Sequence, residues 1–173
     1  DTFIRGLAGR GLYLKPADGE VYTDTRYLFL PDQISRFRDK QKNIALYKSM
    51  ACFLWAQTWY GTFRKKDYKS ASTQQRLDHY ESPERAKRTF LQLENIRLLA
   101  HIKQDLPGLY REMSLLSPLL IPSDKTWAVI SSRLSEKGAT VEDSFEALDK
   151  LVSLGLHDMN ATAYLGDMNL EEV

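Results

Sequence analysis

The sequence predicts a mainly α-helical domain with a small β-sheet at its N-terminus. Residues 43–63 and 83–104 form two long segments without an internal proline, and their apolar side chains recur at helical spacing around more than one face. In the first 31 residues, short apolar runs instead alternate with turn-forming residues. We therefore expect two central buried helices, at about 43–63 and 83–104, with an N-terminal β-hairpin or sheet beside them.

The N-terminal β-structure is expected to include a hairpin. Two predicted strands, residues 12–15 and 20–23, flank a Pro-Ala-Asp-Gly tetrapeptide that has Pro and Asp-Gly where a tight turn needs them. A third predicted strand, residues 26–30, ends at a proline. Because a lone hairpin is only marginally stable, we expect this sheet to lie against helices.

The first central helix, residues 43–63, is expected to pack on most of its sides. It contains Cys52, the only cysteine of the chain, which we interpret as a small buried hydrophobe in a reducing compartment rather than a reactive thiol. It also contains Gln57, a polar residue that needs a hydrogen-bond partner if it is buried.

Local signals place the remaining helices. Ser82-Pro83-Glu84 is a strong start for the second central helix, since it offers an N-cap residue, a proline at the first position and an acid in the first turn. Thr140 and Asp143 form a variant of the capping box. The stretch 70–75 is predicted to be an exposed loop. Further helices are expected over residues 109–120, 123–138 and 141–155.

The chain of 173 residues can bury one sizeable core. We therefore expect a single domain, 1–173, with a β appendage over 1–31 and a helical part over 32–173. Because the sequence opens at Asp1 in the middle of a pattern and without Met, we expect it to be part of a larger protein.

Composition argues against several classes of function. The formal net charge of +1 is unlike that of a dedicated nucleic-acid binder, and no apolar run approaches the roughly 18 residues of a membrane span. We expect a cytoplasmic protein without membrane insertion. The histidines, His79, His101 and His157, lack metal-ligand spacing, so we expect no zinc site and no cofactor. No phosphate loop and no nucleophile elbow are present.

Charge is unevenly distributed along the chain. Residues 64–90 hold eight Lys or Arg against four acids, whereas residues 141–173 hold eight acids against one base. Either region can be a solvated surface or a docking surface for a partner of opposite charge. The residues proposed as possible partner contacts are Arg64, Lys65, Lys66, Arg85, Arg88, Glu142, Asp143 and Glu146.

A polar group interrupts the apolar pattern of the second central helix. Glu94 and Arg97 lie three residues apart and can pair on one helix face. If they are buried they need further partners, for which Gln57 is a candidate. The leading interpretation is a buried polar network of Gln57, Glu94 and Arg97. An inherited, degenerate active site and a partner-recognition site are the alternatives.

Several short motifs occur in an order that resembles a known family. The segments are Phe29-Leu-Pro31, Asn43 with Tyr47, Tyr60-Gly-Thr-Phe63, Leu93-Glu-Asn-Ile-Arg97 and Leu106-Pro-Gly-Leu-Tyr-Arg111. Their succession resembles the middle domain of the NorD and CbbO proteins. Those are von Willebrand factor A-containing partners of MoxR-type AAA+ ATPases. The resemblance extends over roughly residues 28–113.

This resemblance implies an adaptor or scaffold domain without catalysis. CbbO-like proteins act with the CbbQ ATPase to reactivate inhibited Rubisco, and NorD-like proteins act with NorQ to mature nitric oxide reductase. Family members often have His-x-x-x-His where this chain has Phe53 and Gln57, and an Asp where it has Asn95. Glu94 alone cannot hold a catalytic zinc, which normally has three protein ligands. A degenerate metal-dependent hydrolase that has lost its ligands is the alternative, and a module that binds nucleic acid through residues 64–88 is a third, weaker one.

Overall fold

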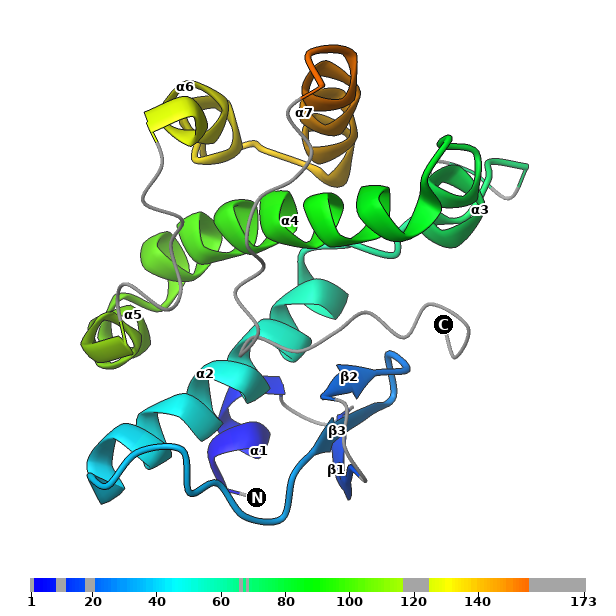
Figure 1. Ribbon diagram of the computed structural model, residues 1–173. Coiled ribbons are helices and arrows are strands. Elements are labelled where there is room, and N and C mark those ends of the chain that lie inside the picture. The colour runs from blue at the N-terminus through cyan, green and yellow to red at the C-terminus, as the bar shows by residue number, and fades with distance from the viewer. Residues whose placement is uncertain are drawn as a thin grey trace.

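The computed structural model describes residues 2–8, 12–17, 21–65, 67, 69–116 and 125–155. The described chain is mainly helical, with a small three-stranded sheet near the N-terminus, as predicted. Helix α4 crosses the middle of the molecule, with α6 and α7 on one side and α2 and the sheet on the other (Figure 1). The helices are α1 (Thr2–Ala8), α2 (Lys40–Trp59), α3 (Thr73–Asp78), α4 (Pro83–Asp105), α5 (Pro107–Met113), α6 (Lys125–Leu134) and α7 (Val141–Ser153); a 3₁₀ turn, Ser114–Leu116, follows α5.

Helix α2 begins three residues before the predicted start and ends four residues before the predicted end. Asp39 is its N-cap, and the Asp39 carboxylate accepts a 2.8 Å hydrogen bond from the backbone N–H of Gln41. The Asn43 side chain holds the preceding loop, because it accepts from the N–H of Phe37 at 2.8 Å and donates to its carbonyl at 2.7 Å. The helix is buried over most of its length, as its apolar width predicts.

Two clusters of buried apolar side chains lie on either side of α4. The α2 core contains Leu46, Phe53 and Leu54 of α2 together with Leu98 and Ile102 from the C-terminal half of α4. The α7 core contains Phe90 and Leu93 from the N-terminal half of α4 and these residues of α3 and α7: Leu77, Phe145, Leu148 and Leu151. Helix α4 is therefore the element that both cores share.

The sheet corrects the predicted hairpin. Its strands are β1 (Tyr13–Pro16), β2 (Tyr22–Thr23) and β3 (Tyr27–Leu30), in the order β1-β3-β2. Strand β3 pairs in parallel with β1 and antiparallel with β2, so β1 and β2 do not form a hairpin together. Strand β3 takes the centre because its side chains Leu28 and Leu30 are buried in the α2 core.

The tight turn lies between β2 and β3 instead. The Asp24 carboxylate accepts from the backbone N–H groups of Arg26 at 2.9 Å and Tyr27 at 2.6 Å, and Thr25 adopts a φ of 70°. An Asp side chain that binds the backbone two and three residues ahead is a common way to form a turn.

The other helix predictions succeed where a cap is encoded locally. Helix α4 begins at Pro83 and α7 begins after the Thr140 and Asp143 capping box, as predicted. The exposed loop predicted for residues 70–75 is wrong in its second half, because Ser72 and Gln75 form a capping box that begins α3. Helix α1 was not predicted. The helix expected over 109–120 begins earlier, at Pro107, and its residues 117–120 lie outside the described chain, as do Ser123 and the Pro-Ala-Asp-Gly turn beyond Ala17.

Candidate functional site

A fully buried ion pair lies in the middle of α4. Glu94 and Arg97 are both 0% exposed, and their side chains meet through two short contacts. Arg97 donates from Nη2 to Oε2 of Glu94 at 2.6 Å and from Nε to Oε1 at 2.7 Å. Two parallel hydrogen bonds between a guanidinium and a carboxylate are among the strongest polar contacts in proteins. The structure therefore places the two residues together inside the protein, as the sequence suggests.

Two buried hydroxyl groups from other elements complete the coordination of Glu94. Thr62, just after α2, donates to Oε2, and Ser144 in α7 donates to Oε1 at 2.6 Å. The Thr62 hydroxyl oxygen also accepts a longer bond, 3.4 Å, from Nη2 of Arg97. The carboxylate thus joins α4 to both α2 and α7.

Arg97 reaches the backbone on both sides of α4. Its Nη1 donates to the carbonyl oxygen of Tyr60 at 3.2 Å and, at 3.5 Å, to that of Ala139. The ring of His101, one turn further along α4, also lies 2.9 Å from the Ala139 carbonyl through Nε2, and it stacks on the Tyr60 ring. The loop before α7 is therefore held at two positions along α4.

The turn after α2 depends on Gly61. Its φ is +72°, a conformation that favours glycine, and an added Cβ would lie 3.2 Å from the Cβ of Arg64. The next N–H, that of Thr62, donates to the carbonyl of Gln57 at 2.8 Å. This turn ends α2 and directs the Thr62 hydroxyl toward α4.

The surroundings of Glu94 keep it ionised. Burial by itself raises the pKa of the carboxyl group, but the Arg97 guanidinium and the hydroxyls of Ser144 and Thr62 together lower it below its ordinary value. Both oxygens accept hydrogen bonds, and neither is exposed to solvent. A carboxylate held in this way joins elements together, and it cannot bind a substrate or a metal ion without losing Arg97.

Gln57 does not belong to this network, which corrects the predicted set. Its side chain is 0% exposed, yet neither Oε1 nor Nε2 makes a hydrogen bond within the described chain. The contact between Gln57 and the network runs through its backbone carbonyl, which accepts from Thr62. The hydroxyls of Thr62 and Ser144 take the place that the sequence assigned to the amide.

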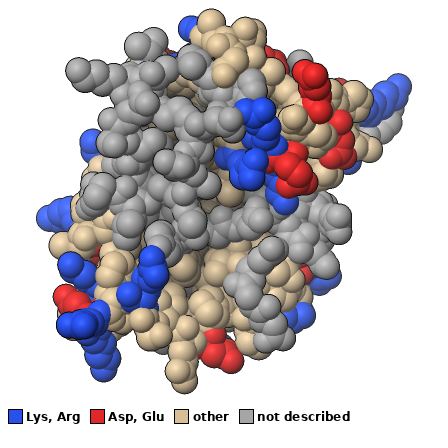
Figure 2. Space-filling model, viewed as in Figure 1, with Lys and Arg blue, Asp and Glu red and all other residues tan. Residues whose placement is uncertain are grey.

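The predicted partner residues fall into two groups. Arg64, Lys65 and Arg88 are exposed, Arg85 is half-buried, and Lys66 lies outside the described residues. The three acids of α7 make ion pairs within the chain: Glu142 with Arg76, and Asp143 and Glu146 with Arg133. Figure 2 shows the consequence in the region of α3 and α7, where basic and acidic side chains lie next to one another. The Arg76–Glu142 pair thus joins the two predicted docking regions, whereas Asp143 and Glu146 pair with Arg133, which lies outside the basic region.

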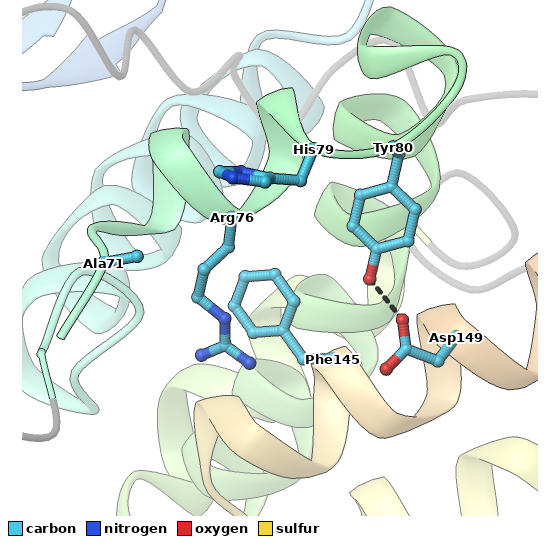
Figure 3. Close-up of a pocket in the computed structure, with 6 residues that line it drawn as sticks. All are labelled: Ala71, Arg76, His79, Tyr80, Phe145 and Asp149. Atoms are coloured by element: carbon cyan, nitrogen blue, oxygen red, sulfur yellow. Dashed lines mark hydrogen bonds between the residues drawn. The ribbon is translucent and has the colours of Figure 1, made fainter.

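A groove lies between α3 and α7, and Arg76 occupies its centre. A pocket of about 490 Å³ is lined by Ala71, Arg76, His79, Tyr80, Phe145 and Asp149. In Figure 3 the Arg76 guanidinium lies alongside the Phe145 ring, and the Tyr80 hydroxyl donates to Asp149. The guanidinium carbon is 3.4 Å from the ring centroid. Sequence reasoning did not single out Arg76, Tyr80 or Phe145 as site residues, because Phe145 is 65 or more positions from the other two and no local motif links α3 to α7.

A metal-binding cluster is not found in the described part of the chain. Among those residues, no group of three or more His, Cys, Asp and Glu is arranged to hold an ion. Burial raises the pKa of the Cys52 thiol to about 12, so this cysteine stays protonated. None of the described helices has the length and apolar character needed to cross a membrane.

Comparison with known proteins adds no relative. No family of known proteins, no curated protein and no solved structure matches the chain. The expected resemblance to NorD and CbbO proteins therefore rests on the sequence motifs alone.

Proposed function

We propose that this chain is a non-catalytic adaptor or scaffold domain of a MoxR-type AAA+ ATPase system. Its partner would be a CbbQ-like or NorQ-like ATPase, and its client an enzyme such as Rubisco or nitric oxide reductase. The protein would contact the ring and the client while the ATPase supplies the work.

One observation supports this proposal above the others. Two of the motifs that resemble the family, Tyr60–Phe63 and Leu93–Arg97, are about 30 residues apart in the chain, yet they meet in the buried network. Thr62 of the first motif binds Glu94 of the second, and the Tyr60 carbonyl accepts from Arg97. Because their residues contact one another, each motif needs the other for its place in the fold. The two motifs therefore behave as one structural unit, which is what a family-specific scaffold would contain.

The geometry around Glu94 also argues against the alternative of a degenerate hydrolase. A catalytic carboxylate needs access to substrate or to a metal ion, whereas Glu94 is buried and bound by Arg97, Thr62 and Ser144. Metal analysis of the purified chain after incubation with zinc distinguishes the two. We expect less than one zinc ion to bind per chain. If one zinc ion per chain is bound and the Glu94→Gln variant does not bind it, the hydrolase alternative would be favoured.

The adaptor proposal is tested by co-expression of the full-length protein with a MoxR-type AAA+ ATPase from the same organism. We expect the two to co-purify and the ATP turnover of the ring to change when the adaptor is added. The isolated chain should have no ATPase activity. Failure to co-purify with any such ATPase, together with unchanged ATP turnover, would refute the proposal.

A further inference from the structure

The groove between α3 and α7 continues into a second, more basic pocket. This pocket, about 300 Å³, shares Ala71 and Arg76 with the larger one. Its other lining residues are Arg64, Lys65, Ser70, Thr73 and Glu142. The two pockets together form a trough with a basic end, a central arginine and an aromatic end. We refer to it as the α3–α7 groove.

The basic end has more positive than negative charge. Arg64 and Lys65 are exposed, and neither forms an ion pair within the described part of the chain. Arg76 is the third cation, and Glu142 is the one carboxylate among the described residues that line this end. At this end of the groove, two guanidinium groups and one ammonium group face a single carboxylate. The end can therefore bind a further negatively charged group.

Arg76 already binds a carboxylate, that of Glu142. Both oxygens of Glu142 accept from it, at 2.8 Å and 3.0 Å, so a carboxylate occupies the arginine in a bidentate fashion. Both side chains are partly exposed, at 31% and 49%, so solvent reaches the pair and screens it. A carboxylate from another molecule can therefore compete with Glu142 for Arg76.

The other end of the groove is lined by aromatic side chains, of which Tyr80 is half-buried and Phe145 is buried. Phe145 lies under the Arg76 guanidinium, and Tyr80 and His79 line the wall beside it (Figure 3). The Asp149 carboxylate accepts a hydrogen bond from the Tyr80 hydroxyl. Aromatic side chains next to an arginine are typical of the residues that dominate protein interfaces.

We propose that the α3–α7 groove is a docking site for an acidic peptide segment of a partner protein. Carboxylates of the segment bind Arg64, Lys65 and Arg76, and an adjacent aromatic side chain packs on Tyr80. The inference rests on the proposed function in one respect: the partner that presents the segment is the ATPase ring. A nucleic acid is the alternative occupant, because phosphates would meet the same cations, and the oligonucleotide competition described below tests it.

The test measures binding of a defined probe by fluorescence anisotropy. The probe is a fluorescein-labelled peptide, Glu-Glu-Gly-Trp-Gly-Glu-Glu, titrated with the full chain at low salt. We expect saturable binding that weakens as ionic strength rises, because exposed charges are screened. The same peptide with lysine in place of glutamate should not bind. Saturable binding of the lysine peptide, or no binding of the acidic one, would overturn the proposal.

Matched variants locate the site. The double variant Arg64→Gln and Lys65→Gln removes two exposed charges from the groove, and we expect it to weaken binding roughly tenfold. The control, Arg38→Gln and Lys42→Gln, removes one exposed Arg just before α2 and one exposed Lys in its first turn, and its affinity should stay within about twofold of the original. Glu142→Gln should strengthen binding because it frees Arg76. Equal losses in both double variants would mean that net charge alone binds the peptide, which would overturn the proposal.

The probe experiment needs no ATPase, so its outcome is independent of the proposed function. If the peptide binds in the groove and the full-length protein still fails to co-purify with an ATPase, the groove is a peptide-binding site but the adaptor proposal is refuted. If co-purification succeeds but is unaffected by Arg64→Gln with Lys65→Gln, the groove is not the docking site. A labelled single-stranded oligonucleotide that displaces the peptide would also refute the proposal, because it would identify a nucleic-acid site.

Discussion

Glu94 and Arg97 stay charged inside the protein because each has several partners. Removal of a carboxylate or guanidinium from water costs several kcal/mol, and this cost is offset only when the remaining donors and acceptors are satisfied. Glu94 accepts from Arg97, Thr62 and Ser144, and Arg97 also donates to two backbone carbonyls. The ion pair is therefore a point of high sensitivity to substitution.

Glu94→Gln should lower the free energy of unfolding by about 3–5 kcal/mol, because it leaves the Arg97 guanidinium buried without its counter-charge. Urea denaturation at neutral pH measures the change. The double variant Glu94→Leu with Arg97→Met is the control. Because it removes both charges, it should lower the free energy of unfolding by less than Glu94→Gln does. A Glu94→Gln loss below about 1 kcal/mol would contradict the structural role assigned to the pair.

The same pair predicts a dependence of stability on pH. The folded pKa of Glu94 lies below its unfolded value of about 4.3, so its contribution is complete at neutral pH and is lost as pH falls through the folded pKa. The difference in unfolding free energy between the original chain and Glu94→Gln should thus be constant above about pH 5.5 and shrink below it. Denaturation curves at a series of pH values measure it; a difference that grew on acidification would show the opposite shift.

At the scale of elements, the turn after α2 positions the partners of the ion pair. The Tyr60 carbonyl and the Thr62 hydroxyl both point toward α4 because Gly61, between them, adopts φ +72°. The left-handed backbone conformation of Gly61 therefore positions the residues after α2 to form hydrogen bonds with α4.

Gly61→Ala should lower the free energy of unfolding by about 1–2 kcal/mol, because a Cβ is disfavoured at this φ and also crowds Arg64. Gly138→Ala is the matched control: an added Cβ there meets nothing within 4 Å, so its effect should stay within about 0.5 kcal/mol. Thermal unfolding of the two variants side by side measures the difference. Equal effects at both positions would mean that the turn tolerates a side chain.

Local signals in the sequence predict elements, and they do not predict what those elements contact. The starts of α4 and α7 follow from Pro83 and from the capping box of Thr140, each encoded within four residues. The pairing of β1 with β3 is non-local, and the residues of α3 are too few and too polar to show a helical period. Glu94 and Arg97 were identifiable because charges interrupt an apolar helix. The hydroxyls that bind Glu94 were not, since Thr62 and Ser144 lie 32 and 50 residues away.

At the scale of the whole molecule, α4 and its ion pair join two cores that are otherwise separate clusters. The α2 core contains Trp55, and the α7 core contains no described tryptophan. The network binds the end of α2 on one side and the loop and helix of α7 on the other. Both cores should therefore unfold together, as a single domain of this size is expected to do.

Coincident unfolding curves are the expected result for the original chain when tryptophan fluorescence and far-ultraviolet circular dichroism are compared. A Trp127→Phe background restricts the fluorescence to Trp55 and Trp59 of α2, whereas circular dichroism averages all helices. In that background Arg97→Met should separate the two curves, because Glu94 is left buried without its counter-charge and the network that joins the α2 core to α7 is weakened, while each core keeps its own apolar contacts. Curves that already differ in the Trp127→Phe background would show two independent units, and curves that stay coincident in Arg97→Met would show that apolar packing along α4 alone couples the cores.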